Sequence, residues 1–128
     1  EASGNLSQIM AILRDRPEGF SVLSGDDAMT FPMMALGADG VISVVANAFP
    51  AEFSAMVKHC LDGRYEEARK IHFSLLEFIE TLFEDGNPAG IKAALEVLGL
   101  MKNNLRLPLV KANKVTRNKL AGLIDRNK

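Results

Sequence analysis

Residues 20–47 read FSVLSGDDAMTFPMMALGADGVISVVAN, and this stretch determines how the rest of the chain is interpreted. It holds two short apolar runs, residues 20–23 and 41–45, with an apolar, helix-like segment between them. Two strands joined by a helix are typical of a βαβ unit, in which the strands lie parallel. Functional groups in such units gather just past the carboxyl ends of the strands. The sequence therefore predicts functional groups at residues 24–27 and 43–47.

An acidic turn separates the first run from the helix-like segment. Asp26 and Asp27 stand where a carboxylate can cap the first turn of the next helix and favour its positive end. Pro32 falls inside that helix and predicts a kink or a late start. Gly37 suits the left-handed position that closes a helix. The expected buried stripe of this helix is Ala28, Phe31 and Ala35.

Helical patterns flank the βαβ unit on both sides. Asn5 is expected to cap an N-terminal helix with a buried face at Leu6, Ile9, Met10 and Leu13. After residue 47 four more helices are predicted, beginning near Pro50, Arg64, Asn87 and Asn113. Their expected inward faces are Phe53, Met56, Val57 and Cys60; Ala68, His72, Leu75, Ile79 and Leu82; Ile91, Ala94, Leu95 and Leu98; and Leu120, Leu123 and Ile124.

Two strands and six helices do not make a balanced sheet protein. An open two-stranded parallel sheet leaves both edges unpaired and offers little area on which helices can pack. The pattern therefore predicts partner strands outside these 128 residues. The fold that fits best is α/β, the C-terminal part of an α/β barrel with a helical appendage. Residues 1–48 would belong to the barrel, and residues 49–128 would hold the last barrel helix and the C-terminal helical region.

The overall charge and the single cysteine limit the classes of function. A formal net charge of −1 argues against binding of nucleic acid or of an anionic membrane through the overall charge of the chain. No apolar run approaches the ~20 residues needed to span a bilayer. Cys60 cannot form an internal disulfide, which fits a reducing cytoplasm. The chain opens at Glu1 and not at a methionine, so we expect a piece of a longer protein.

Residues that often carry chemistry are few and scattered. His59 and Cys60 are adjacent and His72 lies a helix away, but a zinc site needs three or four ligands, so no metal site is predicted. We expect His72 to be a hydrogen-bonded core residue, Cys60 a small core residue and His59 a surface residue. A basic C-terminal segment without interleaved aromatic residues predicts a solvated helix face or an oligomer contact. Its members are Lys102, Arg106, Lys111, Lys114, Arg117, Lys119, Arg126 and Lys128.

Seven short motifs occur in a specific order along the chain. They are EASGNL (1–6), LSGDD (23–27), GADGVISVVAN (37–47), NP (87–88), IKAAL (91–95), LGL (98–100) and LRLP (105–108). Together they resemble the dihydrodipicolinate synthase family, and the likeness runs from Glu1 to about Leu109. The resemblance implies a (β/α)8 barrel, of which this chain would form strands seven and eight with their flanking helices, followed by C-terminal helices. It also implies a homotetramer.

The same resemblance implies lyase chemistry through a lysine Schiff base. Members of the family condense pyruvate with aspartate semialdehyde in diaminopimelate and lysine biosynthesis, without a cofactor. Their lysine stands in a Gly-Ile-Lys-Glu-Ala motif at the end of the sixth strand, and this chain begins at the Glu of that motif. The nucleophile is therefore expected just before Glu1, with no catalytic residue in this chain, which alone would be inactive. Tyr65, the sole tyrosine, does not match the relay tyrosine of the family.

The resemblance also implies that this chain supplies part of the wall of the substrate-binding site. Ile42 corresponds to the residue whose main chain contacts bound pyruvate. Gly25 and Asp26 match the loop that faces the incoming semialdehyde. A glycine at position 25 would let substrate approach the backbone closely. Backbone groups near Ile42 could hydrogen-bond the pyruvate carboxylate without adding a titratable charge.

Two positions depart from the family pattern. Ala89 and Gly90 stand where Ile-Pro is common, and Val45 stands where threonine is frequent. Gly90 is expected to loosen the start of its helix, because glycine inside a helix costs roughly 0.5–1 kcal/mol against alanine.

Two other functions stay open. One is another pyruvate aldolase of the same superfamily, similar to N-acetylneuraminate lyase. The amino-acid sequences of residues 23–27 and 41–47 favour the synthase over this alternative. The other is a non-catalytic half-barrel assembly module. A half barrel exposes apolar strand edges, so such a module would associate with itself or with the missing half.

Overall fold

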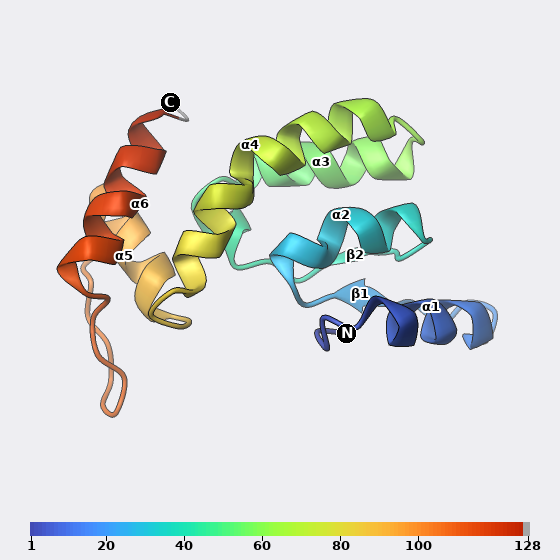
Figure 1. The fold of residues 1–128 in the computed structure, drawn as a ribbon, viewed down its shortest axis with the longest axis horizontal. Coiled ribbons are helices and arrows are strands. Elements are labelled where there is room, and N and C mark those ends of the chain that lie inside the picture. The colour runs from blue at the N-terminus through green and yellow to red at the C-terminus, as the bar shows by residue number, and fades with distance from the viewer. Residues whose placement is uncertain (127–128) are drawn as a thin grey trace.

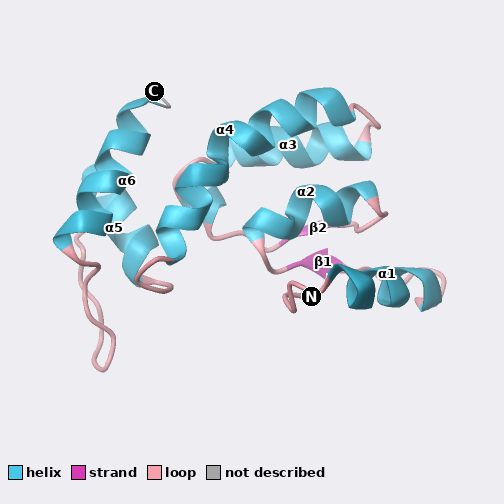
Figure 2. Cartoon of the chain, viewed as in Figure 1, coloured by secondary structure: helices cyan, strands magenta, loops and turns pink. Residues whose placement is uncertain are grey.

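The protein is described by a computed structural model that covers residues 1–126. Figure 1 shows α1, the two strands and α2 together at the N-terminal end, the long pair α3 and α4 beside them, and α5 and α6 at the C-terminal end. Figure 2 shows that helices dominate and that the strands form only a short central pair. The elements are α1 (Leu6–Asp15), β1 (Leu23–Ser24), α2 (Asp27–Ala35), β2 (Gly40–Val41), the 3₁₀ helix η1 (Val45–Asn47), α3 (Pro50–Leu61), α4 (Tyr65–Phe83), α5 (Ala89–Val97) and α6 (Lys114–Arg126).

The predicted βαβ unit is confirmed. β1 and β2 pair in parallel, with α2 as the crossover between them. The register places Leu23 opposite Gly40 and Ser24 opposite Val41. A mostly helical chain with this small parallel sheet fits part of an α/β fold.

The predicted strand bounds, residues 20–23 and 41–45, are wrong, because the strands are Leu23–Ser24 and Gly40–Val41. Side-chain carboxylates accept hydrogen bonds from the backbone amides that a longer ladder would use. Before β1, the Val22 amide donates to Asp39 Oδ2 at 2.8 Å. After β2, the two amides at the start of η1 donate to Asp27 Oδ2 at 2.9 Å each. Such local bonds compete with a ladder and end it.

The N-terminal helix forms as predicted, but its apolar face is only partly covered. Asn5 caps α1 by accepting the Gln8 amide at 3.2 Å. Ile9 is 1% exposed and packs in the core. Leu6 and Met10, predicted on the same buried face, remain 38% and 45% exposed. The described residues therefore leave part of this face without a partner.

The buried stripe predicted for α2 is wrong. Ala28 and Phe31 are half-buried and Ala35 is exposed, whereas Thr30, Met33 and Met34 are buried. The reason is that α2 contacts α3 and α4 as well as both strands, so its covered surface is wider than one stripe. Pro32 does not delay the helix, which begins at Asp27, and Gly37 closes it at φ +100° as predicted.

The helix pair α3 and α4 forms the centre of the core, and its predicted faces are confirmed. Pro50 occupies the first turn of α3. The buried members are Phe53, Met56 and Cys60 from α3 and Ala68, His72, Leu75, Ile79 and Leu82 from α4, with Val57 half-buried. Phe49 packs edge-on against Phe78 of α4, with ring centroids 4.9 Å apart. Aromatic pairs of this geometry add specific packing to area burial.

Gly90 does not loosen α5, contrary to the sequence prediction. A Cβ at this position would lie 2.0 Å from the Leu82 carbonyl oxygen, so only glycine lets α5 approach the backbone of α4 this closely. The start of α5 also differs from the prediction. The helix begins at Ala89, and Pro88, not Asn87, is its N-cap, without a side-chain capping bond.

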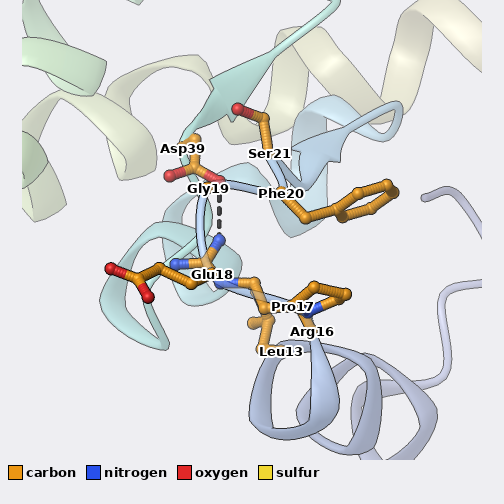
Figure 3. A pocket seen from close by; sticks show the side chains of 8 residues that line it. All are labelled: Leu13, Arg16, Pro17, Glu18, Gly19, Phe20, Ser21 and Asp39. Atoms are coloured by element: carbon orange, nitrogen blue, oxygen red, sulfur yellow. Dashed lines mark hydrogen bonds and ion pairs between the residues drawn. The ribbon is translucent and has the colours of Figure 1, made fainter.

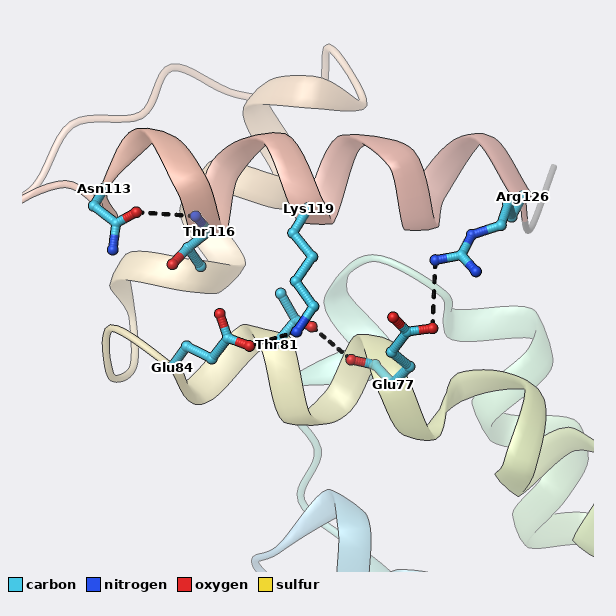
Figure 4. Close-up of polar contacts among 7 residues, drawn as sticks. All are labelled: Glu77, Thr81, Glu84, Asn113, Thr116, Lys119 and Arg126. Atoms are coloured by element: carbon cyan, nitrogen blue, oxygen red, sulfur yellow. Dashed lines mark hydrogen bonds and ion pairs between the residues drawn. The ribbon is translucent and has the colours of Figure 1, made fainter.

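Three basic residues of α6 pair with acidic residues of α4, of its C-cap and of α5. Figure 4 shows Lys119 and Arg126 reaching down from α6 to carboxylates on α4. The pairs are Arg117–Glu96, Lys119–Glu84 and Arg126–Glu77. The paired side chains are partly exposed, which fits a solvated helix face, and the alternative of an oligomer contact stays a prediction. Lys128 lies outside the described residues.

Replacing Gly90 with alanine should destabilise the full-length protein by about 3 kcal/mol, because the added methyl group meets backbone that cannot rotate away. Thermal and denaturant unfolding would measure the loss. Gly122→Ala in α6 is the matched control: a Cβ there has nothing within 4 Å. It should stabilise the protein by about 0.5–1 kcal/mol. An unchanged midpoint for Gly90→Ala would contradict the close packing of α4 and α5.

Candidate functional site

The carboxyl ends of β1 and β2 lie side by side at one edge of the sheet. The Ile42 amide donates to the Ser24 carbonyl at 2.9 Å, which joins the segments that follow the two strands. Gly25 and Asp26 continue from β1, and Ile42 continues from β2. The structure thus brings the three predicted substrate-binding residues to the same edge. In α/β folds this is the edge at which ligands bind.

A small buried network shapes the turn after β1. The hydroxyls of Ser24 and Thr30 each lie 2.8 Å from the Asp26 carbonyl and 3.1 Å from one another. The half-buried Asp26 side chain accepts the amides of Ala28 and Met29 at 3.0 and 3.2 Å. This confirms the predicted N-cap of α2, and it fixes the direction in which the turn leaves the strand.

Asp27 has a role that the sequence did not reveal. Its side chain points away from the α2 cap and accepts the amides of Val44 and Val45 through Oδ2. Asp27 is 2% exposed, and its Oδ1 is shielded and has no hydrogen-bond partner among residues 1–126. The available signal was the doubled aspartate, because one carboxylate is enough to cap a helix.

Gly25 is held by the N-terminal segment. The Glu1 nitrogen donates to the Leu23 carbonyl and the Gly25 amide donates to the Glu1 carbonyl, both at 2.8 Å. These two bonds, one to the residue before Ser24 and one from the residue after it, are the pattern of a parallel strand beside β1. Glu1 is therefore paired with Ser24. A Cβ on residue 25 would lie 3.3 Å from the Ala2 Cβ, so the close neighbour of Gly25 is this chain's own backbone segment.

Ile42 is an exposed residue, but its amide is not free. The residue is 74% exposed, whereas its amide donates to the Ser24 carbonyl. A carbonyl accepts hydrogen bonds and cannot donate one to a carboxylate. The prediction that backbone groups near Ile42 bond the pyruvate carboxylate therefore cannot rest on the Ile42 amide.

Two hollows flank this edge. One, of about 360 Å³, contains Gly25 and Asp26 and is lined further by Ala2, Ala28, Ile79, Glu80 and Phe83. The other is a mostly apolar groove of about 490 Å³ that runs between β2 and α3. Its lining is Leu23, Gly40, Val41, Ser43, Ala46, Phe53, Ser54, Val57, Lys58 and Leu61. Ile42 lines neither hollow, so the described residues do not enclose the three predicted residues in one pocket.

A third pocket, of about 400 Å³, lies at the opposite edge of the sheet. Figure 3 shows Arg16 from the end of α1 reaching Asp39, the residue that precedes β2. Asp39 Oδ2 accepts Arg16 Nη1 at 2.6 Å and the Val22 amide at 2.8 Å. The Val22 amide, and next the Arg16 guanidinium, lower the pKa of Asp39. The amino edge of parallel strands stabilises such folds, and we assign this pocket a structural role.

The histidines and the cysteine form no reactive site. His72 is buried, as predicted, and stacks on Phe31 with ring centroids 5.3 Å apart, but its Nδ1 has no partner among the described residues. Burial lowers the pKa of His72 and raises the pKa of Cys60, a buried core residue as predicted. His59 is half-buried, which differs from the predicted surface position.

Two negative findings apply to the part of the chain that the structure covers. No three His, Cys, Asp or Glu side chains gather where they could hold a metal ion. No helix within residues 1–126 has both the length and the apolar composition to cross a membrane.

The sequence profile of the Dihydrodipicolinate synthetase family matches residues 1–127. The chain belongs to this family. A relative from Parabacteroides distasonis, 4-hydroxy-tetrahydrodipicolinate synthase, is 54% identical over 94% of the chain. The same enzyme from Phocaeicola vulgatus is 50% identical over 98% of the chain. The matched region is 40% and 42% of those proteins, so the chain spans about two fifths of their length.

The fold agrees with this membership. The crystal structure of dihydrodipicolinate synthase from Aquifex aeolicus matches 99% of the chain with a TM-score of 0.95 at 40% identity. The match takes up 43% of that structure. The small sheet and the surrounding helices are therefore a contiguous part of the family's larger fold. The motifs at residues 23–27 and 37–47 had correctly indicated the family.

Removing the Asp39 carboxylate should lower the thermal midpoint of the full-length protein at neutral pH. Because the folded protein lowers the pKa of Asp39 below 3.8, its stabilising effect is present above that value and is lost as the pH falls through the lowered pKa. The difference in midpoint between wild type and Asp39→Ala should therefore shrink in acid. Calorimetry across this pH range would measure it. A difference that grows on acidification would contradict the assignment.

Proposed function

We propose that this chain is the C-terminal part of a 4-hydroxy-tetrahydrodipicolinate synthase, a lyase of diaminopimelate and lysine biosynthesis. The complete enzyme would condense pyruvate with aspartate semialdehyde through a lysine Schiff base. Support comes from the named relatives, which are up to 54% identical to the chain, and from the TM-score of 0.95 to a solved synthase. Residues 1–48 would complete a (β/α)8 barrel as strands seven and eight, and residues 49–128 would form its last helix and the C-terminal helices.

The observation that carries the proposal is the strand-like pairing of Glu1 with Ser24. Side chains alternate between the two faces of a strand, and paired residues share a face. The Ser24 hydroxyl bonds Thr30 of α2, so Glu1 faces the helices. A residue directly before Glu1 would then face the opposite side, together with Leu23 and Ile42. A lysine there would project to the face at which the exposed Ile42 side chain lies.

The chemistry requires a neutral amine that attacks the ketone of pyruvate. Burial inside a barrel disfavours the charged form of a lysine and lowers its pKa, which supplies that amine. Protonation and loss of water give the iminium, and loss of a methyl proton gives the enamine. The enamine carbon then attacks the aldehyde, whose oxygen takes up a proton, and attack of water or an amine on the resulting iminium frees the lysine. In this scheme Gly25 and Asp26 face the semialdehyde, and Ile42 contacts pyruvate. No cofactor or metal ion takes part.

The remainder of the protein is the first partner that this proposal requires. The apolar groove beside β2 would be covered by the preceding half of the barrel, because an open strand edge and an apolar surface favour association. The complete enzyme would be a cytoplasmic homotetramer. A stable, monodisperse monomer of these 128 residues alone would argue against the need for the missing half.

Borohydride trapping tests the mechanism directly. The full-length protein, incubated with pyruvate and borohydride, should gain one reduced pyruvyl group on the lysine that precedes Glu1, located by peptide mapping. Replacing that lysine with alanine should abolish the adduct. Turnover with aspartate semialdehyde distinguishes the synthase from an N-acetylneuraminate lyase, which would require a different aldehyde partner. Absence of any lysine adduct would exclude both aldolases and favour a non-catalytic module.

A further inference from the structure

Asp27 begins α2 without capping it. Oδ2 accepts the amides of Val44 and Val45 at 2.9 Å each, from the segment that follows the neighbouring strand. Asp27 is 2% exposed, Val45 is fully buried and Val44 is half-buried, so water has little access to these bonds. A carboxylate that accepts two amides holds a backbone segment more firmly than a neutral acceptor does.

The bonds of Asp27 complete a two-point attachment of the segment after β2. At one end, the Ile42 amide donates to the Ser24 carbonyl at 2.9 Å. At the other end, Asp27 holds residues 44 and 45. Between them, the Ser43 hydroxyl accepts the Ala46 amide at 2.9 Å, within the same segment. The path of the backbone at Ile42 and Ser43 is therefore set by the sheet on one side and by Asp27 on the other.

We propose that Asp27 is a positioning residue for pyruvate binding. By holding the turn after β2, it sets where the backbone of Ile42 and Ser43 meets the substrate. This inference rests on the proposed function, in which that backbone faces pyruvate. Asp27 acts through the backbone and does not touch the substrate.

The role is separable from the stability of α2. Asp26 caps that helix through the amides of Ala28 and Met29, so removal of the Asp27 carboxylate leaves the cap in place. The immediate loss falls on the half-buried amide of Val44 and on the buried amide of Val45, and the Val45 amide regains a partner only if the turn moves. The effect of a substitution should therefore concentrate on the binding of pyruvate.

The second oxygen of Asp27 predicts how a conservative substitution behaves. Oδ1 is shielded and unpartnered among the described residues, and a buried carboxylate oxygen generally accepts a donor from the protein or an ordered water. In Asp27→Asn the amide oxygen can still accept the amides of residues 44 and 45. The NH₂ group then stands where Oδ1 was and opposes any such donor. Asparagine should rescue binding only in part.

The test compares full-length variants by steady-state kinetics with pyruvate and aspartate semialdehyde. Asp27→Ala should raise KM for pyruvate about tenfold or more, with kcat and KM for the semialdehyde each changing less than about threefold. Asp27→Asn should fall between wild type and Asp27→Ala. Asp85→Ala is the control, because Asp85 also accepts hydrogen bonds, from Asn113 and Thr116, and lies outside both strands and the segments that follow them. It should lower the thermal midpoint and leave KM for pyruvate unchanged.

The outcomes separate this inference from the proposed function. A wild-type protein that forms no borohydride adduct with pyruvate would overturn the proposed function and this inference with it. A wild-type adduct combined with an unchanged pyruvate KM in Asp27→Ala would overturn the inference alone. If Asp27→Ala does not fold, Asp27→Asn decides: a raised pyruvate KM supports the inference, and a KM equal to that of wild type overturns it.

Discussion

The parallel pairing of two very short strands is the constraint around which this chain is built. Each strand contributes two residues, and a ladder of this length is too weak to hold itself together. Its stability comes from α2 on one face and from the helices that pack behind α2. The other face carries Leu23 and Ile42, which remain 37% and 74% exposed. A sheet covered on one face only, with an apolar groove along its edge, is the shape expected of part of a barrel.

Two adjacent aspartates have different roles at the carboxyl edge of this sheet. Asp26 satisfies free amides of the first turn of α2, which fixes the helix that follows β1. Asp27 reaches the segment after β2, so the two strand ends are tied together by side chain as well as by the ladder. This explains why β2 stops at Val41 even though apolar residues continue after it. The amides that would extend the strand serve a carboxylate instead.

The sequence predicted what depends on local pattern and missed what depends on neighbours. Helical periodicity correctly placed the faces of α3, α4 and α6, and Asn5 and Asp26 were recognisable caps. Gly90 was misjudged, because its propensity is visible in the sequence whereas its distance from the Leu82 carbonyl is not. The face of α2 was misjudged because contact with four elements widens it. At the site, local pattern indicated only the strand ends. Ile42, Gly25 and Asp26 were singled out by family resemblance, and Asp27 required the structure.

The Ile42 amide is already hydrogen-bonded, and this limits how the proposed site can bind its substrate. With that N–H bonded to the Ser24 carbonyl, Ile42 offers a substrate an exposed, apolar residue and no free amide. Residues 42–47 carry no titratable side chain, so this wall adds no charge that would hold a neighbouring lysine protonated. The carboxylate that holds this segment, Asp27, is buried and accepts two amides. Donors for a pyruvate carboxylate must therefore be groups other than the amides of Ile42, Val44 and Val45, which are already hydrogen-bonded.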